Sequence, residues 1–203
     1  IDSAIIVDGL KYKIAAEGVV KVDIIGSLSK GLEGKELSSM GGMAKAGVVA
    51  FSDDGRYVQN CDFMRKAMEY AGMFGKIVID HCEDADLIEG GHMHEGVVSH
   101  ELGLKGRPAV AEDIAVARDI LLAEVTGTPV HIAHISTKNA VQMVRQAKAK
   151  GLKVTAEATP QHMILTDEAL RSYDPRFKVN PPLRSEEHRK AVVEGLVDGT
   201  IDA

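Results

Sequence analysis

The sequence predicts an α/β fold built on a parallel β-sheet. Short runs of β-branched residues alternate with longer helical stretches, in five strand-then-helix cycles. The runs are almost continuously apolar, which is typical of strands buried on both faces. Consecutive units of this kind suit a TIM-type (β/α)8 barrel or a doubly wound sheet. No glycine-rich phosphate loop follows a strand, and this disfavours a nucleotide-binding sheet.

The first half of the chain opens with a predicted helix at residues 1–18, which ends at Gly18. A later helix is predicted because Phe63, Ala67 and Tyr70 begin an apolar series at i, i+4 and i+7 that would face the core. The elements expected after the first helix are, in order, a strand at 19–29, a helix at 34–46, a strand at 48–55 running into a polar turn, and the helix at 60–74.

The second half repeats the cycle. Glycine ends two of its predicted helices, and Ser185 is a suitable N-cap for the last one. The expected elements are a strand at 76–84, a Gly- and His-containing loop at roughly 88–107, a helix at 109–127, a strand at 128–137, a helix at 138–151, a strand at 152–160, an extended segment at 177–184, a helix at about 185–197 and the opening of another strand at 198–203.

Composition excludes several classes of protein. Hydrophobic residues make up 45% of the chain, and 24 Lys and Arg stand against 30 Asp and Glu, for a net charge of −6. Without a long basic run, we expect no nucleic-acid partner. The sequence has no 18-residue apolar segment, so we expect no membrane association. Only Cys61 and Cys82 are present, without a signal-like segment, which favours a reducing, cytoplasmic location.

Side chains that ligate metals stand where three predicted strands end. Asp53 and Asp54 follow one strand, His81 follows the next, and His134 follows a third. In a parallel βα barrel these strand ends form the catalytic face, so such residues converge. Two imidazoles and a carboxylate suit zinc. One such residue would more often be structural, whereas three in successive units favour a metal site.

Six sequence blocks follow one another in order over nearly the whole chain. They are FSDDG at 51–55, HCED at 81–84, HISTK at 134–138, TAEATPQH at 155–162, KVNPPLRSEE at 178–187 and DGTIDA at 198–203. Together they resemble bacterial class I dihydroorotases of the amidohydrolase superfamily. The resemblance implies a TIM-type barrel and zinc-dependent, reversible hydrolysis of dihydroorotate to N-carbamoyl-L-aspartate, in pyrimidine biosynthesis, with one or two zinc ions.

The resemblance also implies roles for particular residues. It places the bridging carboxylate on Asp54, rather than on its neighbour Asp53, and two further metal ligands on His81 and His134. It places a substrate-contacting amide on Asn180, whose side chain can donate and accept. His162 either lines the site or packs beneath it. The histidines of the 88–107 loop, His92 and His94 among them, are expected to be solvated.

Two other readings stay open. Allantoinases and dihydropyrimidinases are cyclic amidohydrolases that place a carboxylated lysine on the corresponding strand, and no lysine occurs between Val48 and Gly55. A non-catalytic homologue that partners aspartate transcarbamoylase would lack ligands, whereas Asp54, His81 and His134 are present. The resemblance also implies a homodimer or a complex with aspartate transcarbamoylase.

Length indicates a partial barrel. A complete barrel takes typically ~250 residues, and residues 1–203 are expected to form one incomplete domain with approximately strands 3 to 7 and their helices. The first-strand His-x-His of the resembled family is absent, and its catalytic Asp is expected beyond Ala203, so no catalytic residue is assigned within the chain. We expect these 203 residues to be inactive and poorly folded by themselves.

Overall fold

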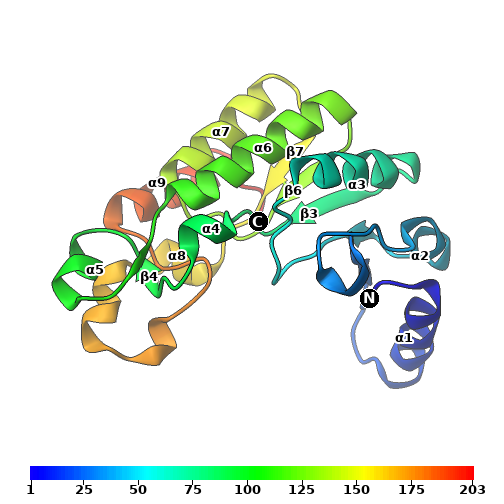
Figure 1. Cartoon of the computed structure of the whole chain (residues 1–203), viewed down its shortest axis with the longest axis horizontal. Helices are drawn as coiled ribbons and strands as arrows, with labels where there is room; N and C mark the ends of the chain where they lie inside the picture. Colours follow the sequence, from blue (N-terminus) through cyan, green and yellow to red (C-terminus); the bar gives the residue numbers. More distant parts are fainter. The chain divides into compact units, whose positions relative to one another are not determined.

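A computed structural model describes all residues from 1 to 203 (Figure 1). The chain divides into two compact units, which are described in turn. Unit 1 comprises residues 1–81 and 122–131, and unit 2 comprises residues 82–121 and 132–203. The expectation of one domain over 1–203 stays a prediction.

Unit 1 holds three parallel strands, each preceded by a helix. Ile25 pairs with Ala50, and Ala50 pairs with Ile77, so the strands run in chain order. The backbone N–H of Val78 donates to Pro129 O at 3.1 Å, which places residues of the next strand beside β3. The elements are α1 (Ala4–Glu17), β1 (Ile25–Gly26), η1 (Lys30–Leu32), α2 (Met40–Ala46), β2 (Ala50–Phe51), α3 (Cys61–Met73) and β3 (Ile77–Asp80).

Local sequence explains the helix boundaries of unit 1. Asn60 caps α3, because its side-chain oxygen accepts from Phe63 N at 2.9 Å. Gly47 ends α2 with a φ of 101°, a left-handed conformation that glycine adopts at little cost. Phe51, Met64 and Met68 are fully buried, so β2 and the apolar face of α3 contribute to the core.

Unit 2 contains the remaining parallel pairings. Two hydrogen bonds join the ends of β6 (Val130–Ile132) and β7 (Val154–Ala156), from Glu157 N to Ile132 O and from Ile135 N to Glu157 O. Thr137 caps α7 by accepting from Ala140 N. The elements that lie in it are α4 (Ala85–Ile88), β4 (Met93–His94), α5 (Val97–Leu102), β5 (Gly106–Arg107), α7 (Lys138–Ala149), β7 (Val154–Ala156), α8 (Pro160–Ile164), η2 (Asp167–Ser172), η3 (Pro175–Phe177) and α9 (Glu186–Val197).

Helix α6 (Val110–Thr126) and strand β6 (Val130–Ile132) belong partly to each unit. The resulting sheet has five strands in the order β1-β2-β3-β6-β7. This is the run of five parallel inner strands that the alternating pattern predicts. None of the helices combines the length and the apolar composition that a membrane span requires.

Several predicted boundaries are wrong. The strand expected at 19–29 is reduced to Ile25–Gly26, because Val19 and Val20 are 96% and 70% exposed and their β-propensity is not matched by burial. The loop at 88–107 contains α5 and the parallel pair of β4 and β5. The tail at 198–203 is not a strand, but Asp202 N donates to Ala156 O and Ala158 N donates to Ala203 O, so it lies beside β7.

Candidate metal centre and its polar surroundings

The adjacent aspartates after β2 have different environments in unit 1. Asp53 is buried, and its Oδ1 accepts from the backbone N–H groups of Leu28 and Ser29 at 2.8 and 3.1 Å. Its Oδ2 accepts from the Ser29 hydroxyl. Asp53 therefore joins the end of β2 to the segment after β1.

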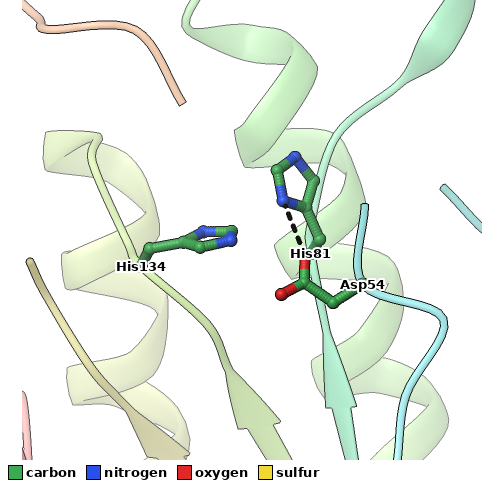
Figure 2. A group of neighbouring side chains, drawn as sticks. All are labelled: Asp54, His81 and His134. Atoms are coloured by element: carbon green, nitrogen blue, oxygen red, sulfur yellow. Dashed lines mark ion pairs between the residues drawn. The ribbon is translucent and has the colours of Figure 1, made fainter. Parts of the chain in front are cut away.

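The Asp54 carboxylate meets His81. Its side chain is 51% exposed, and Oδ1 lies 3.2 Å from Nδ1 of the buried His81 (Figure 2). Gly55 N also donates to this Oδ1, at 2.7 Å, which fixes the carboxylate. The Tyr57 ring packs on His81 with centroids 5.0 Å apart. Two of the expected ligands thus converge at the ends of the neighbouring strands β2 and β3.

His134, which Figure 2 also draws, follows β6 and belongs to unit 2. Its φ of 35° lies in the left-handed region that residues with a Cβ rarely adopt. Buried Ala133 and Ile135 flank it. The turn that continues to Thr137 is held by Glu112, whose Oε1 accepts from Ser136 N at 2.7 Å and from Thr137 N at 3.0 Å.

Asn180 lies on the extended segment of unit 2 before α9. Its Oδ1 accepts from Arg107 Nη1 at 2.6 Å. Because a guanidinium can only donate, the atom that faces it must be the amide oxygen. Arg107 also donates to Gly91 O and lies 3.6 Å from Glu83, so several contacts hold it in place.

His162 is a packed structural residue. It is buried, its Nδ1 lies 2.7 Å from the Thr159 hydroxyl, and its Nε2 donates to Pro181 O at 2.9 Å. The pKa of His162 is lowered, and burial is the largest cause, because it disfavours the charged imidazolium. Both ring nitrogens are therefore used within unit 2, and of the two roles considered for His162 the structure favours packing.

The expectation that His94 is solvated is wrong, whereas His92 is exposed as expected. His94 lies on β4 with only 7% of its surface exposed. Burial, then the charges of Arg184 and His188, lowers its pKa to about 3. The pairing of β4 with β5 buries this residue, and such a pairing is not visible in a polar local sequence.

Sequence reasoning missed Glu112 and Arg184. Arg184 is 3% exposed, and its Nε donates to Ser136 Oγ at 3.1 Å, its Nη1 to Arg107 O at 3.1 Å and its Nη2 to Glu112 Oε2 at 3.4 Å. The only available signal was the position of Arg184 within KVNPPLR, four residues after Asn180.

Solved structures share the fold. An L-hydantoinase from Arthrobacter aurescens has a TM-score of 0.82 at 21% sequence identity, over 99% of this chain and 46% of that chain. A dihydropyrimidinase from Brevibacillus agri NCHU1002 has a TM-score of 0.75 at 20% identity, over 95% and 44%. The chain therefore has the α/β fold of TIM-barrel amidohydrolases and represents part of such a barrel.

Sequence similarity defines the family more closely. The sequence model of the Dihydro-orotase-like family matches residues 6–140. A dihydroorotase of Pelotomaculum thermopropionicum is 59% identical over 92% of this chain and 44% of its own length. One of Acetivibrio thermocellus is 50% identical over 99% and 47%. The chain belongs to the dihydroorotase-like family, and it spans about half the length of these relatives.

Proposed function

We propose that this chain is part of a dihydroorotase, which reversibly hydrolyses the cyclic amide of dihydroorotate to N-carbamoyl-L-aspartate in pyrimidine biosynthesis. The observation that carries the proposal is the meeting of Asp54 and His81 at the ends of two neighbouring parallel strands. Strand ends are where TIM-type barrels place their chemistry. The dihydroorotases that are 59% and 50% identical support the choice of substrate.

We propose that Asp54, His81 and His134 bind zinc. Each offers one atom of a type that zinc binds, an imidazole nitrogen or a carboxylate oxygen. Asp54 fits this role better than Asp53, because the oxygens of Asp53 already accept from Leu28 and Ser29. When bound, zinc polarises a carbonyl oxygen and lowers the pKa of water to about 7.

Asn180 is the proposed substrate contact within the chain. The hydrogen bond from Arg107 holds Oδ1 and thereby turns the amide nitrogen away from Arg107. We infer that this hydrogen bond sets the orientation in which the Asn180 amide meets the ring amide groups of dihydroorotate. The proton donor for the leaving nitrogen is not assigned to any residue of this chain.

The proposal extends to location and partners. Neither Cys61 nor Cys82 forms a disulfide, which suits a reducing cytoplasm. Assembly as a homodimer, or together with aspartate transcarbamoylase, is supported by the sequence resemblance alone.

Ligand substitutions in the complete gene product test the function. We expect His81→Ala and His134→Ala each to lose nearly all hydrolysis of dihydroorotate and to bind less zinc, while circular dichroism shows a folded protein. His100→Ala is the matched control, because His100 is an exposed histidine of α5. A parental rate and zinc content in either ligand variant would contradict the assignment.

A further inference from the structure

We propose that Glu112 and Arg184 form a buried positioning pair that sets the orientation of His134 and couples it to the segment carrying Asn180. The inference rests on the proposed function, since it assigns roles relative to a metal ligand and a substrate contact. All the residues concerned belong to unit 2.

Glu112 holds the backbone that follows His134. Its two oxygens accept from Ser136 N, Thr137 N and the Ser136 hydroxyl, so one carboxylate fixes two consecutive peptide groups. Thr137 is also the N-cap of α7. The contacts therefore define where the turn ends and where the helix begins.

The turn needs such support because of its conformation. His134 has a φ of 35°, and residues with a Cβ persist in this region only where surrounding contacts over-determine the backbone. Without the Glu112 contacts, we expect the 134–137 segment to relax toward ordinary φ values. Relaxation would rotate the imidazole of His134 away from its present direction.

Arg184 connects the turn to the Asn180 segment. Its guanidinium donates to Ser136 Oγ and Glu112 Oε2 on one side and to Arg107 O on the other. The side chain of Arg107 in turn donates to Oδ1 of Asn180. A continuous series of hydrogen bonds thus runs from the turn after β6 to the proposed substrate contact.

A gain in folding stability does not by itself explain the buried pair of Glu112 and Arg184. The Glu112 and Arg184 side chains are 3% and 2% exposed, and a buried ion pair is often no more stabilising than apolar residues of similar volume. An apolar pair, however, would leave the N–H groups of Ser136 and Thr137 without their acceptor. The charged pair therefore serves the geometry of the turn.

In variants of the complete gene product, we expect zinc affinity and thermal stability to change independently of each other. In Glu112→Ala, which removes the acceptor of Ser136 N and Thr137 N, we expect zinc binding, measured by chelator competition, to weaken about 10–100-fold, as for other changes next to metal ligands. The absorption spectrum of the cobalt-substituted protein should also change, since it reports ligand geometry. Asp113→Ala is the matched control, because Asp113 is the next residue of α6 and its carboxylate accepts from the side chains of Thr137 and Asn139 rather than from the backbone of the turn.

A double variant distinguishes positioning from folding. Adding Arg184→Met to Glu112→Ala removes the buried charge that the single variant leaves unpaired, so we expect the thermal midpoint to rise above that of Glu112→Ala while zinc affinity stays low. Recovery of parental zinc affinity in the double variant, or parental zinc affinity in Glu112→Ala, would overturn the inference. His134→Ala is the reference. Unchanged zinc affinity in His134→Ala refutes the proposed ligand, whereas weakened affinity in His134→Ala with parental affinity in Glu112→Ala refutes only the positioning pair.

Discussion

Asp53 and Asp54 should have separable effects when each is replaced. Asp53→Ala removes a buried acceptor from two backbone N–H groups, those of Leu28 and Ser29. Leaving one buried donor unsatisfied costs about 1–3 kcal/mol. We therefore expect Asp53→Ala to lower the free energy of unfolding by about 2–5 kcal/mol.

Asp54→Asn should change stability little and metal binding greatly. The Asp54 side chain is half-exposed, and its contact with His81 involves a partly solvated carboxylate, so we expect a stability change within about 1 kcal/mol. Replacing the carboxylate by an amide removes the charged ligand, so zinc content should fall sharply.

The assay uses urea unfolding followed by circular dichroism, together with zinc analysis of the purified complete gene product. Asp53→Asn is the graded control, because its amide oxygen can still accept from the backbone and the Ser29 hydroxyl can accept from its NH2. We expect it to be less destabilising than Asp53→Ala. The reasoning would be refuted if Asp53→Ala kept parental stability and lost zinc while Asp54→Asn kept its zinc.

Two further predictions concern unit 2. Burial, followed by the charges of Arg184 and His188, lowers the pKa of His94 from 6.5 to about 3. Between pH 6.5 and pH 3 the unfolded chain therefore binds a proton that the folded chain does not, so the free energy of unfolding falls as the pH decreases. His94→Gln should make the fall in unfolding free energy between pH 6.5 and 4.5 shallower, with exposed His100→Gln as control; an unchanged slope would contradict it. Arg107→Met should raise KM for dihydroorotate about 5–10-fold with a smaller change in kcat, because it removes the hydrogen bond to Oδ1 of Asn180. Steady-state kinetics would exclude this role if KM stayed constant.

The sequence predicted the inner strands because each consists of a short apolar run between turns, a signal that is local. It overestimated their lengths for the same reason. Val19 and Val20 have the composition of a strand, yet they are exposed, since β-structure requires a partner strand as well as propensity. The β4–β5 pair was missed because Met93 and His94 pair with Gly106 and Arg107 across a polar loop.

Candidate ligands were predictable because the position after a strand is a sequence property, whereas their supporting residues were not. Glu112 and Arg184 are 72 positions apart, and nothing in the residues around either one indicates its partner. His162 shows the same limit. Its neighbours in TPQH leave its role open, and only the contacts with Thr159 and Pro181 O favour packing.

The two aspartates show how adjacent residues of one turn come to have different roles. Strand β2 ends at Phe51, and Arg56 N donates to Asp53 O, so Asp53 and Asp54 lie where the chain turns after the strand. Asp53 faces the segment after β1 and is saturated by Leu28 and Ser29. Asp54 faces His81. Because Asp53 fixes the end of β2, it also fixes the direction in which the next residue points, and an exposed carboxylate at Asp54 thereby gains the defined orientation that a metal ligand needs.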